Sequence, residues 1–90
     1  GCITATANVN AGPVAEVIRL HGSGGRAAAE TAMVDVRAYR QVMQEYPAIP
    51  SMKRLLALRL DDPIWATVRP PFLPAADATG RELEERLSAL

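Results

Sequence analysis

The predicted fold is decided by the first ten residues, Gly1-Cys2-Ile3-Thr4-Ala5-Thr6-Ala7-Asn8-Val9-Asn10. Three of the first six are β-branched, which favours an extended backbone, and no charged residue precedes Glu16. The run is too short and too rich in small residues for a helix, so we interpret it as a strand buried on both faces. Cys2 is then a small buried strand residue, and residues 8–10 supply a turn and a helix N-cap.

A strand buried on both faces is typical of a parallel sheet, and a sheet needs neighbouring strands. The remaining residues contain no second convincing strand, so we expect further polypeptide before Gly1. One strand followed by helices indicates the last βα unit of a TIM (β/α)8 barrel with a C-terminal helical extension. The predicted fold class is therefore α/β, although the chain itself is mostly helical.

Helical periodicity predicts four helices after this strand. Their expected ranges are Asn10 or Ala11 to Gly22, about Arg26 to Tyr46, roughly Pro50 to Leu60, and from Thr79 onward. Thr79 and Glu82 have the spacing of a capping box at the start of the last helix. The proline-rich segment between the last two helices is expected to be irregular, with room for one helical turn at residues 63–67.

Composition excludes several classes of partner. The ten basic residues balance the ten acidic ones, so the chain lacks the basic surface that nucleic acid or an acidic membrane surface requires. The longest uninterrupted aliphatic run, residues 55–58, is too short to span a bilayer. Cys2 is the only cysteine, which excludes an intramolecular disulfide and a multi-cysteine zinc site. A lone cysteine and no visible secretory signal indicate a cytoplasmic protein.

Three segments of the chain carry motifs that occur together in one enzyme family. Residues 1–9 are similar to a segment that commonly reads Gly-x-Ile-Ser-x-Thr-x-Asn-Val. Pro47-Ala48-Ile49-Pro50-Ser51-Met52-Lys53 resembles a Pro-x-Ile-Pro-x-Lys-type motif, and Val68-Arg69-Pro70-Pro71-Phe72-Leu73-Pro74 resembles a Leu-Arg-x-Pro-x-x-Pro loop. These three segments resemble the eighth barrel strand, the start of the C-terminal helices and the loop before the final helix in the family of dihydrodipicolinate synthase and N-acetylneuraminate lyase. The order and spacing also agree, so the resemblance covers essentially all 90 residues.

The resemblance implies a Schiff-base lyase or class I aldolase that acts on pyruvate or another 2-oxo acid. Residues 1–22 are then the eighth strand and helix of the barrel, and residues 23–90 a three-helix extension. The family's catalytic lysine lies on the sixth strand, outside this chain, so this segment alone is expected to be inactive. The expected partners are the 2-oxo acid, the remainder of the barrel, and further copies in a homotetramer or dimer. No cofactor and no metal are implied.

Ile3 is the one substrate-binding residue that the resemblance assigns here, because its position lines the pocket beside the Schiff base. Thr4 and Thr6 are weaker candidates, since barrel strands often use threonine simply to pack. Acetylneuraminate lyases tend to carry a serine where this chain has Ala5, which makes sialic acid cleavage a less favoured activity. The substrate beyond a 2-oxo acid stays open.

The other reactive side chains have structural interpretations that we favour. Lys53, the only lysine, falls on the expected solvent side of its helix, away from any predicted pocket. His21, the only histidine, falls in the last turn of a helix, where the helix dipole favours its charged form. Asp61 and Asp62 end a helix and lack a third metal ligand nearby.

Three residues of the proline-rich segment have similar structural interpretations. Arg69 is expected to pair with a carbonyl or a neighbouring subunit rather than with substrate. Trp65 and Phe72 are expected to cover the core. A non-catalytic helical interaction module, or a related barrel that has lost its lysine and acts as a regulator, are the alternative functions.

Overall fold

The computed structural model describes residues 1–90 and contains α-helices without any β-strand. Its elements are α1 (Ala7–Gly22), α2 (Arg26–Gln44), α3 (Ala48–Arg59), the short 3-10 helix η1 (Pro63–Ala66) and α4 (Asp77–Ser88). The predicted α/β class, with a barrel strand at its start, is therefore wrong for this chain. The chain folds as four helices and is all-helical.

Residues 1–6, which we call the arm, do not form a strand because no other segment of the chain is available to pair with them. The carbonyl groups of residues 4–6 instead accept hydrogen bonds from the N–H groups of residues 7–10. The backbone therefore turns directly into α1 and satisfies its hydrogen bonds locally. Cys2 and Ile3 are exposed, so the expectation that Cys2 is buried is also wrong.

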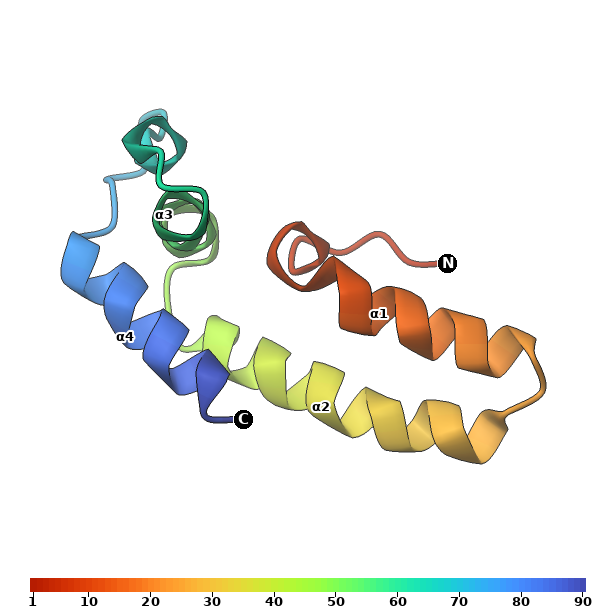
Figure 1. Cartoon of the computed structure of the whole chain (residues 1–90). Coiled ribbons are helices and arrows are strands. Elements are labelled where there is room, and N and C mark those ends of the chain that lie inside the picture. Colours follow the sequence, from red (N-terminus) through yellow and green to blue (C-terminus); the bar gives the residue numbers. More distant parts are fainter.

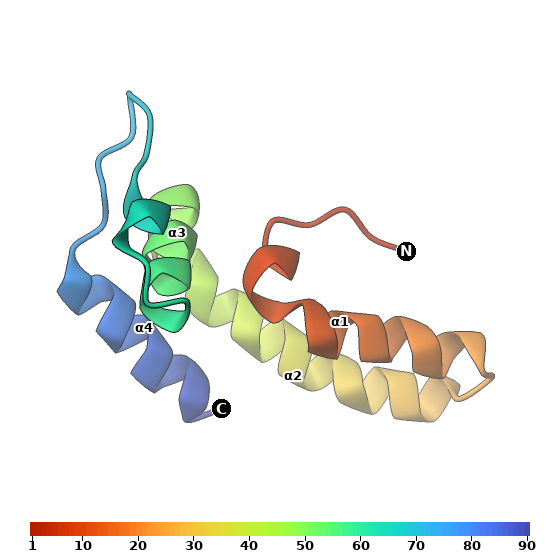
Figure 2. The same cartoon turned by 45° about the horizontal axis from the view of Figure 1, so that its top comes forward.

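The helices form two regions that share α2. Helices α1 and α2 run antiparallel and side by side, and we call residues 7–41 the hairpin (Figures 1 and 2). Helices α3 and α4 pack together near the C-terminal end of α2, and we call residues 42–90 the C-terminal cluster (Figure 1). The turn between α1 and α2 contains Gly24 with a φ of 82°, a backbone conformation that glycine adopts without strain.

The core lies in the C-terminal cluster. Six buried apolar side chains from α2, α3 and α4 pack against one another there, namely Val42, Met43, Met52, Leu55, Leu83 and Leu87. Helix α2 turns one apolar stripe toward the rest of the chain, with Ala29 and Met43 buried and Ala32, Met33, Val36 and Tyr39 partly buried. No helix is both long enough and apolar enough to cross a membrane.

Helices α1 and α4 begin earlier than predicted. Helix α1 begins at Ala7 with Thr6 at its N-cap, rather than at Asn10 or Ala11 with a cap at residues 8–10, because the carbonyl groups of residues 4–6 already accept helical hydrogen bonds.

Helix α4 begins at Asp77 rather than Thr79, and no side chain caps it. The Asp77 carboxylate pairs with Arg54 at 2.7 Å, so a contact between helices replaces the predicted capping box at Thr79. The short turn expected at residues 63–67 is present as η1, and the Asp62 side chain caps it by accepting from the N–H of Ile64.

The chain is more open than a globular domain of its length. Its radius of gyration is 14.4 Å, whereas the usual scaling gives about 12 Å for 90 residues. Its accessible surface is 6202 Å², against about 5,100 Å² for a folded monomer of the same mass. Roughly 1,000 Å² more surface is therefore exposed than such a monomer leaves in water.

Candidate functional site

The arm borders two grooves, which together form the candidate functional site. One groove has a volume of about 270 Å³ and is mainly apolar, and its lining consists of Cys2, Thr4, Thr6, Val14, Val17, Ile18, Met33, Val36 and Arg40. The other has a volume of about 330 Å³ and is lined by Ile3, Thr4, Ala5, Thr6, Arg40, Met43, Gln44, Ala48 and Met52. Ile3, the predicted substrate-binding residue, is fully exposed at the second groove.

Three polar side chains are common to both grooves. The hydroxyl groups of Thr4 and Thr6 lie 3.0 Å apart and share a hydrogen bond. Arg40 reaches both grooves from α2, and none of the five ion pairs of the chain involves it. A guanidinium with free donors suits a carboxylate, and hydroxyl groups can complete such a site. The arrangement therefore offers binding groups for an acid, and no lysine lines either groove.

The structure brings neither Lys53 nor His21 to the arm. Lys53 lies partly exposed on α3 and does not line either groove at the arm. His21 is exposed in the last turn of α1, at a groove that it shares with Arg26, Glu30 and Arg37. A lysine nucleophile needs a pocket and a proton acceptor within hydrogen-bond reach. The chain assembles no such pair around either residue.

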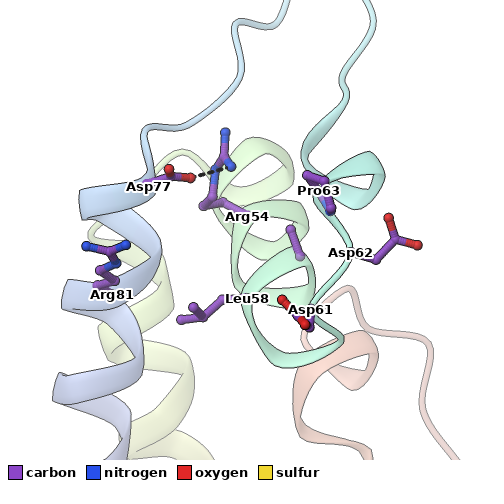
Figure 3. A pocket seen from close by; sticks show the side chains of 8 residues that line it. Arg54, Leu58, Asp61, Asp62, Pro63, Asp77 and Arg81 are labelled. Atoms are coloured by element: carbon purple, nitrogen blue, oxygen red, sulfur yellow. Dashed lines mark hydrogen bonds and ion pairs between the residues drawn. The ribbon is translucent and has the colours of Figure 1, made fainter.

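A smaller polar pocket of about 180 Å³ lies between α3 and the start of α4 (Figure 3). Arg54 spans it by donating to the Asp77 carboxylate at 2.7 Å and to the Ala75 carbonyl at 2.6 Å. Asp61 and Asp62 also line it, but their carboxylates point in different directions (Figure 3). No cluster of three or more His, Cys, Asp and Glu side chains is arranged to hold a metal ion. The contacts of Arg54 therefore hold α3 to α4.

The segment from η1 to the start of α4 leaves large apolar side chains exposed. Trp65 and Phe72 are both 44% exposed, so the expectation that they cover the core is wrong. Arg69 is exposed and takes part in no ion pair. This segment projects away from the helices in Figure 2. It supplies exposed apolar surface rather than a polar site.

Two arginines with extensive contacts are not predicted by any sequence pattern. Arg86 on α4 donates to Glu45 at 2.7 Å and to the Tyr46 hydroxyl at 3.0 Å. The hydrogen bond between Arg86 and Glu45 raises the pKa of Arg86 and lowers the pKa of Glu45. Arg59 on α3 pairs with Glu84 at 2.7 Å, which raises the pKa of Arg59. Each of these two ion pairs joins residues more than 20 positions apart in the sequence, and local residue spacing does not predict such pairs.

Comparisons of this chain with protein families, with curated proteins and with solved structures give no match.

Proposed function

We propose that this chain is the substrate-adjacent C-terminal part of a Schiff-base lyase similar to dihydrodipicolinate synthase. A lysine outside these residues condenses with pyruvate or another 2-oxo acid, and the arm lies beside the bound acid. The observation that carries the proposal is the motif in residues 1–9 together with its exposure. They hold the motif that resembles the family's substrate-facing segment, and Cys2 and Ile3 within them are exposed.

The polar groups at the arm support an acid as the ligand. Arg40 and the hydroxyl groups of Thr4 and Thr6 line the same two grooves. Ile3 adds an apolar side chain next to them, as a ligand with a short carbon chain requires. The absence of a lysine from these grooves is consistent with a nucleophile that other parts of the enzyme contribute.

The exposed surface supports a partner for the chain. The excess of roughly 1,000 Å² over a folded monomer is comparable to the roughly 800 Å² that each partner buries in a standard protein interface. We propose that the remainder of the enzyme covers this surface, and that the complete protein is a cytoplasmic homotetramer or dimer.

Reductive trapping tests the proposal. The complete protein that contains this chain is incubated with pyruvate and then with borohydride. A lysine amine that attacks the ketone releases water to form an imine, and hydride addition to the imine carbon leaves a stable secondary amine. Peptide mapping by mass spectrometry is expected to locate the adduct on a lysine outside residues 1–90.

Lys53→Arg provides the matched control, because it removes the only lysine of this chain and keeps its charge. We expect the variant to form the adduct as the parent protein does, and residues 1–90 alone to form none. An adduct on Lys53, or no adduct with any of a panel of 2-oxo acids, would contradict the proposal.

A non-catalytic interaction module is the second candidate function. Its support is the group of exposed apolar side chains between α3 and α4, which includes Ile64, Trp65, Phe72 and Leu73. Exposed apolar groups gathered in one segment are typical of protein contact sites. The same trapping experiment separates the two functions, since an interaction module forms no adduct with any 2-oxo acid.

A further inference from the structure

Pro13 leaves one backbone carbonyl of α1 without its helical partner. In a regular α-helix, the carbonyl of Val9 accepts from the N–H group four residues later. That residue is Pro13, which has no N–H and whose ring crowds this same carbonyl. The backbone responds at Asn10, which leaves the helical conformation with φ −140° and ψ 37°. The first turn of α1 is thus set at an angle to the rest, and the Val9 carbonyl needs another donor.

Side chains from two other helices supply that donor. Arg59 of α3 donates from Nη1 to the Val9 carbonyl at 2.8 Å. The Tyr39 hydroxyl of α2 donates to the same oxygen at 3.1 Å and accepts from Arg59 Nη2 at 3.1 Å. Both donors therefore converge on one atom, which lies three residues after the arm ends.

Glu84 of α4 holds Arg59 in this position. Its carboxylate accepts from Arg59 Nε at 2.7 Å and from Nη2 at 3.4 Å. The side chains of Arg59 and Glu84 are 30% and 35% exposed, so water screens the pair less than it screens a surface pair. All four helices thus meet at this group, which we call the Arg59 hub, consisting of Val9, Tyr39, Arg59 and Glu84.

We propose that Arg59 is a positioning residue that sets the direction of the arm, and so places Ile3 and the Thr4–Thr6 pair. The role of the arm's direction in catalysis rests on the proposed function. The contacts that set this direction do not depend on that function. The first turn of α1 is separated from the rest of the helix by the break at Asn10. The angle between the two parts is therefore fixed by contacts outside α1, and the Val9 carbonyl receives two of them.

Arg86 offers a matched comparison within the same fold. It also joins α4 to α2 through a carboxylate and a tyrosine hydroxyl, at Glu45 and Tyr46. No hydrogen bond connects Arg86 to residues 1–10. Removal of the Arg86 donors therefore weakens a similar helix contact without affecting the arm.

A nitroxide attached to Cys2 reports the direction of the arm, because Cys2 is exposed and is the only cysteine. In the parent chain, residues 1–90, we expect the label to broaden the amide signals of Arg40 and Met33, which lie at the same groove. In Arg59→Met, loss of a charge-assisted hydrogen bond is expected to lower the ratio of positioned to displaced arm about tenfold. The broadening then spreads over many amides. Arg86→Met is expected to keep the parent pattern.

If circular dichroism shows that Arg59→Met has lost its helices, Tyr39→Phe provides a second variant for the test. It removes one donor to Val9 without exposing an unpaired charge, and we expect an intermediate spread of the broadening. The proposal would be overturned if Arg59→Met and Tyr39→Phe, both folded, kept the parent's broadening pattern. Equal changes in Arg59→Met and Arg86→Met would also overturn it, as would uniform broadening in the parent chain. The label measures direction without any substrate, so this outcome is independent of whether the Schiff-base proposal holds.

Discussion

The hairpin and the C-terminal cluster differ in how many of their residues are buried. Of the 13 buried residues, only Asn10 and Ala29 precede Val42. Leu55 and Leu83, from α3 and α4, are completely buried. The apolar side chains of α1 are partly buried, and Ile18 is 44% exposed.

The difference follows from the number of helices that pack together in each region. Each helix has an apolar stripe, and two antiparallel helices cover only part of each other's stripes. In the cluster, the end of α2 supplies a third surface for α3 and α4, so a core can close. The C-terminal cluster therefore has the closed core, while its exposed apolar side chains, among them Ile64, Trp65 and Phe72, lie outside that core. The arm and hairpin bury few residues and leave Ile3 and Ile18 exposed.

Truncation of a core leucine is expected to have the largest effect on stability. Leu55→Ala or Leu83→Ala removes a fully buried side chain and leaves a cavity, with an expected loss of about 2–5 kcal/mol in the free energy of unfolding. Val17→Ala in the hairpin is the control and is expected to lose at most about 1 kcal/mol, since Val17 is only partly buried. Urea denaturation followed by circular dichroism measures both. Equal losses would mean that the two regions are equally closed.

Two glycine substitutions with opposite expected signs sharpen the comparison further. A Cβ atom at Gly80 lies 2.8 Å from Arg54 Cγ, so Gly80→Ala displaces Arg54 from Ala75 and Asp77. The loss of these bonds is expected to exceed the gain in helix propensity, with a net destabilisation of about 1 kcal/mol. A Cβ atom at Gly22, the last residue of α1 in the hairpin, meets no atom within 4 Å. Gly22→Ala is therefore expected to stabilise by up to about 0.5–1 kcal/mol. Thermal melts that rank the variants the other way would refute this.

Acid is expected to weaken the cluster through Glu45. Its hydrogen bond to Arg86 lowers the pKa of Glu45 in the folded chain. A carboxyl with a lowered folded pKa stabilises above its unfolded pKa of about 4.3, and this stabilisation is lost as pH falls through the folded value. In Glu45→Gln, the free energy of unfolding should fall less steeply below about pH 4. An unchanged slope in that range would show that the pair contributes nothing to the cluster.

Ser51→Ala is expected to have the smallest effect. The Ser51 hydroxyl is completely buried in α3 and has no hydrogen-bond partner. Removing a buried polar group that makes no hydrogen bond is neutral or stabilises by up to about 1 kcal/mol. A chemical denaturation curve that shows a loss above about 1 kcal/mol would reveal a partner for this hydroxyl in solution.

The helices were predictable because their signals are local. The period of apolar residues defines α2, and proline positions define η1 and the start of α3. The arm was mispredicted because β-branched residues indicate a strand only where a neighbouring strand supplies backbone partners. The start of α4 was misplaced because Asp77 is held by Arg54, 23 positions earlier.

The candidate site was predictable only in part. Ile3 was chosen through resemblance, and the structure places it at a groove. That Pro13 leaves the Val9 carbonyl without a helical donor follows from their spacing of four. The donors themselves, Arg59 and Tyr39, come from distant parts of the chain, which local patterns do not reveal. The position of Arg40 beside the arm is likewise a contact between distant parts of the chain that local patterns do not reveal.

Hydrogen exchange of the complete protein tests most directly whether the arm lies beside the bound acid. The protein is trapped with pyruvate and borohydride, and its peptides are compared with those of the untreated protein by mass spectrometry. We predict slower exchange in the peptide that contains residues 1–9 and unchanged exchange in α4. Equal exchange of residues 1–9 in the two samples would contradict the account.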